Sequence, residues 1–112
     1  MKFIIIAHEL KKKVSLIERF TGKNTTLPIL GNILFSISGQ TLKLTATNLE
    51  IACVMHVQAK IIREGSFCVP ARTFSSYIQT VQSDEKIECD DQNGNLSIKT
   101  ETIKTKILTI PS

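Results

Sequence analysis

The stretch EIACVMHVQAKII, residues 50–62, has the longest regular pattern in the chain. Apolar side chains recur at every second position, and most of those between them are polar or small. Successive side chains of a β-strand point to opposite faces, so this period of two predicts one continuous strand over residues 50–62. The side chains expected on its buried face are Ile51, Cys53, Met55, Val57, Ala59 and Ile61.

Shorter runs on both sides of this stretch repeat the strand pattern. The pair Asn93-Gly94, between two of these runs, is a strong hairpin signal because both residues readily adopt a positive φ. The further strands expected are residues 2–6, 32–38, 41–47, 67–69, 86–90, 96–100 and 102–109.

Two segments change to the helical period. Over residues 8–20, Leu10, Val14 and Ile17 recur at helical spacing, and residues 71–82 repeat that pattern, with Pro70 expected at the first helical position. The resulting order, βαββββαβββ, predicts an α+β fold in which two helices pack on antiparallel sheets. A length of 112 residues predicts a single domain, residues 1–112.

Composition and charge indicate a globular domain with an excess of basic residues. The 42% of hydrophobic and 21% of charged residues are typical of a globular domain. The net charge of +4 is uneven, because residues 1–83 carry ten Lys and Arg against four Asp and Glu. The apolar start ends at His8 and Glu9, and no apolar run approaches the length of a membrane span, so we expect a cytoplasmic protein without a membrane partner. Three scattered cysteines suit small buried side chains in a reducing compartment.

A catalytic or metal-binding constellation is not expected. Cys53 and His56 have a C-x-x-H spacing, but residues three apart on a strand point to opposite faces and cannot share a metal ion. His8 beside Glu9 lacks a nearby nucleophile other than a serine. The acidic residues of 84–91 lack the spacing of a calcium loop. We therefore predict a protein that is not an enzyme and that has no cofactor.

The basic face of the first helix is the strongest functional feature. At 100° per residue, its apolar stripe lies opposite His8, Lys12, Ser15 and Arg19, with Lys11 at the border. Such a face either meets phosphates or is simply a solvated surface. The few aromatic residues lie in apolar surroundings, so any nucleic acid would be bound through its backbone, without sequence readout.

Three segments carry a resemblance to a known family. They are TTLPILGNILF (residues 25–35), LKLTATNLEI (42–51) and GSFCVPARTF (65–74), with MKFII at the start and LTIP near the end. In order and spacing they resemble the N-terminal domain of the bacterial β sliding clamp, the processivity subunit of DNA polymerase III. The likeness runs over the whole chain.

The resemblance implies a fold and a function. Clamps of this family have three similar domains per chain, and two chains close into a ring. Helices line the hole, and duplex DNA passes through it without being read. The clamp tethers the replicative polymerase, does no covalent chemistry and is opened by an ATP-driven loader. This chain would be the first of the three domains, cut from a longer protein, without the later domains that bind polymerase and loader.

The resemblance also implies site residues. The expected DNA-facing side chains are Lys12, Arg19 and Arg72, followed by Lys11, Lys13 and Lys23, with Asn24 in the turn where the family has a basic residue. The last strand would pair with the other subunit, through Ile103, Ile107 and Leu108, with Lys104 and Lys106 limiting promiscuous pairing. The segment TLPILGN, residues 26–32, is expected to pack beneath the first helix. The alternative function is a free-standing basic α+β module that binds nucleic acid or protein.

Overall fold

The computed structural model of the chain describes residues 1–20, 31–47, 51–92, 94–101 and 103–109. Within these residues, two α-helices, one 3-10 helix and nine strands follow one another. The helical elements are α1 (Ala7–Ile17), η1 (Glu18–Phe20) and α2 (Ala71–Ile78). The strands are β1 (Lys2–Ile6), β2 (Asn32–Ser38), β3 (Thr41–Thr47), β4 (Ala52–Val57), β5 (Lys60–Arg63), β6 (Gly65–Pro70), β7 (Lys86–Gln92), β8 (Asn95–Lys99) and β9 (Lys104–Leu108).

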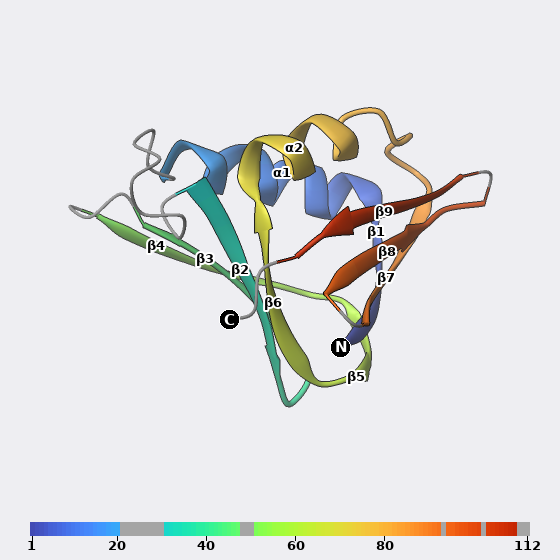
Figure 1. The fold of residues 1–112 in the computed structure, drawn as a ribbon, viewed down its shortest axis with the longest axis horizontal. Coiled ribbons are helices and arrows are strands. Elements are labelled where there is room, and N and C mark those ends of the chain that lie inside the picture. Colours follow the sequence, from blue (N-terminus) through green and yellow to red (C-terminus); the bar gives the residue numbers. More distant parts are fainter. Residues whose placement is uncertain (21–30, 48–50, 93, 102, 110–112) are drawn as a thin grey trace.

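The strands form two antiparallel sheets that diverge from one another beneath the helices (Figure 1). The five-stranded sheet has the order β5-β1-β7-β8-β9, and the four-stranded sheet has the order β4-β3-β2-β6. Both helices lie on the same side of the molecule and pack against each other. The predicted α+β class, with two helices on antiparallel sheets, is confirmed.

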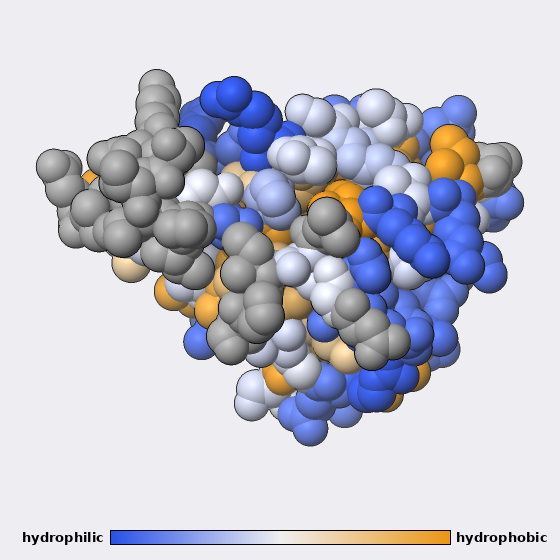
Figure 2. Space-filling view, in the orientation of Figure 1, coloured by the Kyte–Doolittle hydropathy of each residue, from blue (hydrophilic) through white to orange (hydrophobic). Residues whose placement is uncertain are grey.

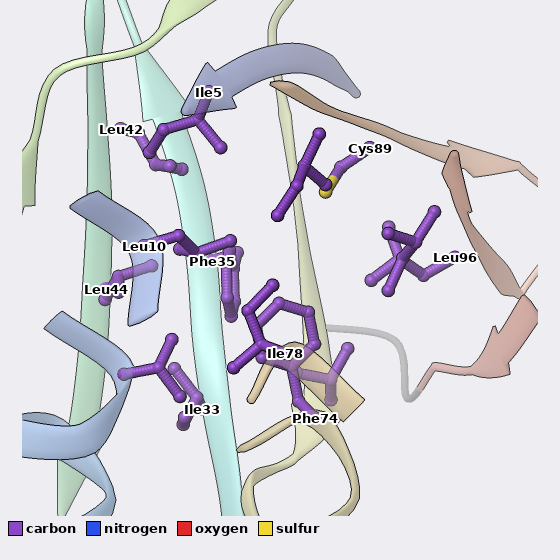
Figure 3. Close-up of a cluster of buried hydrophobic side chains, with 14 of the residues drawn as sticks. Ile5, Leu10, Ile33, Phe35, Leu42, Leu44, Phe74, Ile78, Cys89 and Leu96 are labelled. Carbon is purple, nitrogen blue, oxygen red and sulfur yellow. The ribbon is translucent and has the colours of Figure 1, made fainter. Parts of the chain in front are cut away.

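The core fills the space between the helices and the two sheets (Figure 3). Phe35 on β2 lies at its centre, stacked on Phe67 with ring centroids 4.9 Å apart. Phe74 of α2 meets the same ring edge-on at 5.1 Å, and Phe3 of β1 lies at 6.4 Å. Rings from both sheets and one helix thus meet at a single side chain, so the core fixes the position of α2 over the sheets.

The prediction of one continuous strand over residues 50–62 is wrong. The segment forms β4 in the four-stranded sheet and β5 in the five-stranded sheet, with Gln58 and Ala59 between them. The chain crosses from one sheet to the other in two residues, an even number, so the alternation keeps its phase across the break. Ile51, expected on the buried face, precedes β4 and is exposed.

Both helices are shorter than predicted, with the excess taken up by tighter turns. After Ile17 the first helix continues as the 3-10 helix η1 up to residue 20. The second helix ends at Ile78, where Val81 N–H donates to the Ile78 carbonyl three residues back, at 3.2 Å. Val81 is still buried, which explains why its spacing looked helical. Pro70 precedes α2 in an extended conformation as the last residue of β6.

The cysteines are free and mostly buried, and two of the acidic residues form ion pairs. All three cysteines are free; Cys68 and Cys89 are buried and Cys53 is half-buried. Burial raises the pKa of the Cys89 thiol above its usual range, which leaves this side chain protonated.

Of the predicted acidic cluster, Glu88 pairs with Lys2 at 2.9 Å and Asp90 pairs with Arg63 at 2.6 Å. Among the described residues, no helix has the length and apolar character needed to span a membrane.

Candidate nucleic-acid interface

The first helix presents one buried and one exposed face, as its sequence predicted. Leu10, Val14 and Ile17 are fully buried in the core. The opposite face exposes Lys12, and Arg19 is exposed on η1, two residues beyond the end of α1. The buried stripe therefore fixes the direction in which these two cations point, away from both sheets.

The second helix contributes a smaller exposed face. Phe74 and Ile78 hold α2 against the core, while Arg72 in its first turn is exposed. The backbone of β6 leads directly into α2 at Ala71, so the pairing of β6 with β2 sets where Arg72 lies.

A hydrogen bond joins the exposed faces of the two helices. The side-chain amide of Gln79, just after α2, donates to the hydroxyl oxygen of Ser15 on α1 at 3.0 Å. These residues are far apart in the sequence, and only packing of the two helices brings them together. The surface that carries Lys12, Arg19 and Arg72 is therefore one continuous face, which we call the helix face.

The helix face carries more positive than negative charge. Its cations are Lys11, Lys12, Arg19 and Arg72, and none of them is in an ion pair with another described residue. The carboxylate of Glu9 lies 3.2 Å from the His8 imidazole, and Glu18 is the other acidic residue there. Unpaired ammonium and guanidinium groups on one surface attract a polyanion at long range.

The structure separates the predicted DNA-facing residues into groups. Lys12, Arg19 and Arg72 are exposed on the helix face, while Lys11 is half-buried on the flank that also carries Ser15. Lys13 is half-buried on the opposite flank, where it lines a groove together with residues of β1, β4 and β5. Lys23 and Asn24 lie outside the described residues, as does most of the segment TLPILGN.

The predicted edge strand is observed. Within the described chain, β9 pairs with β8 alone and forms one border of the five-stranded sheet. Ile103 is 58% exposed, directly before β9, and Lys104 and Lys106 are exposed on it. Ile107, by contrast, is only 7% exposed because it points into the core of its own domain. Its side chain belongs to the core of this chain, and the part predicted for Ile107 in subunit pairing stays a prediction.

The model of the family described as "DNA polymerase III beta subunit, N-terminal domain" matches residues 1–112, the whole chain. The chain belongs to this family. The beta sliding clamp of Pseudomonas putida is 31% identical over 100% of this chain, and that of Buchnera aphidicola subsp. Acyrthosiphon pisum is 33% identical over 99%. The chain spans 31% of the length of each of these two relatives.

The fold of the family is shared as well. A crystal structure of the sliding clamp from Pseudomonas aeruginosa matches with a TM-score of 0.93 at 29% identity. The match covers 99% of this chain and 30% of that one. The resemblance to the clamp family that the sequence indicated is confirmed, and so is the fold that it implied.

Exposed apolar side chains are the feature of this family member that sequence reasoning missed. Leu16 of α1 is 41% exposed. Val54 on β4 and Ile62 on β5 are also exposed, and both strands border a sheet in the described chain. The angle of Leu16 on the helix could have predicted its exposure. The exposure of Val54 and Ile62 depends on strand order, which the sequence does not give.

Proposed function

We propose that this chain is the first of three domains of a ring-shaped, non-catalytic processivity clamp. The ring is a homodimer that encircles duplex DNA, tethers the replicative polymerase to it and works in the cytoplasm. Polymerase and clamp loader bind to the other domains. The family membership over the whole chain supports this proposal, as does a chain that spans 31% of its relatives' length.

The observation that carries the proposal is the continuous helix face, whose cations form no ion pair with the residues that the structure describes. Lys12, Arg19 and Arg72 reach solvent from two helices that are fixed to each other by packing and by the Gln79–Ser15 hydrogen bond. Long side chains on a rigid surface can contact phosphate oxygens without reading bases. Contacts of this kind are weak and non-directional, so they can move along the duplex.

The side chains of the helix face favour sliding over specific recognition. Phe74, the aromatic residue of α2 nearest its start, is fully buried, and Tyr77 is half-buried. Neither can serve as a stacking platform for bases. Acidic residues such as Glu9 beside the cations lower the affinity, which suits a protein that must not stall on DNA.

The test of DNA binding uses this chain and two duplexes of about 20 base pairs with unrelated sequences. Both should bind weakly and alike, and log K should fall with log salt by about 0.9 for each phosphate contacted. The double variant Lys12→Glu/Arg72→Glu should bind at least about tenfold more weakly at low salt. Sequence-selective binding that is insensitive to salt would contradict the proposal.

Ring closure is the second part of the proposal. The free edge of β9 would pair with a strand of the other subunit, with Ile103, Lys104 and Lys106 on the accessible surface and Leu108 further along the strand. Because Ile107 is a core residue, replacing it would lower the stability of the domain and so would not test the edge alone. In the full-length protein, Ile103→Asp should shift sedimentation from dimer toward monomer, and an unchanged dimer would count against this edge.

The domain count has its own test. Serum raised against this chain should detect, in extracts of the source cells, a polypeptide of about three times its 12.5 kDa. A band at 12.5 kDa would deny the chain a three-domain subunit and would favour a free-standing basic module instead.

A further inference from the structure

A groove of about 690 Å³ opens beside the helix face, where β1 passes into α1. Residues of β1, of α1, of the crossover from β4 to β5 and of the start of β7 line it. Its apolar part is made by Ile4, Ile6, Val57 and Ala59. Ile6 is 42% exposed, so apolar surface remains open to solvent here.

Strand register explains why lysines border this apolar surface. Ile4 on β1 pairs with Lys60 on β5, and Ile6 pairs with Lys86 on β7. Directly paired residues of an antiparallel sheet project to the same face, so the two lysines flank the two isoleucines on either side of β1. Lys13 lines the same groove from α1, the helix that follows β1.

The charges of the groove are not neutralised within the described chain. Lys13, Lys60 and Lys86 are in no ion pair with a described residue. Glu9, which also lines the groove, has its carboxylate 3.2 Å from His8. Glu88 on β7 also pairs with Ile4 in the sheet, but its carboxylate is held by Lys2 at 2.9 Å. The three ammonium groups around the apolar surface thus outnumber the two carboxylates beside it.

A second hollow of about 580 Å³ extends the groove past the crossover. It shares His56, Val57, Gln58 and Ala59 with the first and continues to Gln40 and Thr41 at the β2–β3 turn. The two hollows together are called here the crossover groove. A lining that runs from β1 and α1 past the crossover to the β2–β3 turn suits an extended chain better than a compact small molecule.

We propose that the crossover groove binds an extended acidic peptide segment of a partner protein. An aliphatic side chain of the peptide would cover Ile4 and Ile6, and flanking carboxylates would meet Lys13, Lys60 and Lys86. Duplex DNA supplies phosphates but no aliphatic side chain to cover the isoleucines, so the apolar part of the groove favours a peptide. Partial burial of the peptide carboxylates makes their pairing with lysine stronger than on an open surface.

The experiment measures fluorescence polarisation of a labelled peptide, Glu-Asp-Ile-Glu-Val-Asp-Glu, with the 112-residue chain. Two matched double variants test the two surfaces. One is Lys60→Glu/Lys86→Glu in the groove, and the other is Lys12→Glu/Arg72→Glu on the helix face. All four side chains are exposed, and each double variant changes the net charge equally. Circular dichroism establishes that each variant is folded.

The groove variant should bind the peptide at least about tenfold more weakly and bind duplex DNA as before. The helix-face variant should show the reverse. A peptide with Ser in place of Ile and Val should also lose at least about tenfold in affinity. Each loss is measured at physiological salt, where charges beyond about 8 Å from the peptide are screened.

Several outcomes would overturn the proposal. Equal losses in both variants would mean general attraction between opposite charges, and full binding by the serine peptide would mean that the apolar surface is not used. Loss of DNA binding in the groove variant would make the groove a nucleic-acid surface. Absence of peptide binding would reject the site, while the DNA test of the helix face would stand independently.

Discussion

Two strands, β2 and β9, illustrate how differently the same alternating pattern can be used. β2 lies inside the four-stranded sheet, paired with β3 on one side and β6 on the other. β9 borders the five-stranded sheet and pairs with β8 alone in the described chain. Both point every second side chain inward, Phe35 from β2 and Ile107 from β9.

The two strands differ in what surrounds those inward side chains. Phe35 is enclosed by rings from Phe3, Phe67 and Phe74, so removing it leaves a cavity that rigid neighbours cannot close. Ile107 keeps a residual exposure of 7% at a border with one partner strand. The comparison teaches that an interior strand stabilises the domain, while an edge strand is also available for association.

The largest effect is expected at the interior strand. Phe35→Ala should lower the free energy of unfolding by about 3–5 kcal/mol, because it removes the ring on which the core is built. Urea denaturation followed by circular dichroism measures it. Ser38→Ala, at the exposed end of the same strand, is the control and should stay within about 0.5 kcal/mol. A loss of less than about 1 kcal/mol for Phe35→Ala would contradict the claim that the interior strand stabilises the domain more than the edge strand does.

A smaller effect is expected at the inward side chain of the edge. Ile107→Ala should cost about 2 kcal/mol, at the low end for such truncations, because a strand with one neighbour can move to fill the space. The same denaturation experiment applies, with the adjacent exposed Lys106→Ala as control. A cost equal to that of Phe35→Ala would show that the edge is packed as rigidly as the interior.

An ion pair between β1 and β7, Lys2–Glu88, joins two interior strands of the five-stranded sheet. The side-chain hydrogen bond from Lys2, 2.9 Å away, lowers the pKa of Glu88, helped by the charges of Lys2 and Lys99. A depressed carboxyl pKa adds stability above the unfolded pKa, and this stability is lost as pH falls through the folded pKa.

Replacing Lys2 by Gln should therefore cost about 0.5 kcal/mol at pH 7, since both partners are partly exposed. The difference from the unmodified chain should vanish below the folded pKa of Glu88 and shrink in high salt. Denaturation at several pH values measures it. A difference that stays constant down to acid pH would mean that Lys2 acts through packing alone.

The smallest effect on stability is expected at the outward side of the edge. Ile103→Asp should change the free energy of unfolding of this chain by less than about 0.5 kcal/mol, because the side chain is already 58% exposed. Thermal unfolding of the 112-residue chain measures it. A large loss would place Ile103 in the core of the domain and would remove it from the proposed subunit contact.

The faces of most elements could be predicted from the sequence. Leu10, Val14 and Ile17 are buried as their helical spacing indicated, and Lys12 is exposed opposite them. Lys104 and Lys106, expected as charges on an edge strand, are exposed on β9. These predictions succeed because the direction of a side chain depends on local backbone geometry.

The failures concern elements whose surroundings depend on distant residues. The run over residues 50–62 has one uninterrupted pattern, yet its two halves belong to different sheets. Lys13 follows Lys12 in a run of three lysines, but it lines a groove made with β1, β4 and β5 instead of sharing the helix face. Helical spacing placed Lys12 but not Lys13 opposite the apolar stripe, yet it could not show that strands from distant parts of the chain form a groove beside Lys13.

The sequence by itself determined the family, the α+β class and the inward and outward faces of helices and strands, because these follow from local periodicity and from short segments at fixed spacing. The tertiary structure alone decided the strand order, the break between β4 and β5, and the joining of two helices into one basic face. It also decided that lysines flank apolar side chains in the crossover groove. Such arrangements depend on pairing and packing between residues far apart in the chain, which no local pattern encodes.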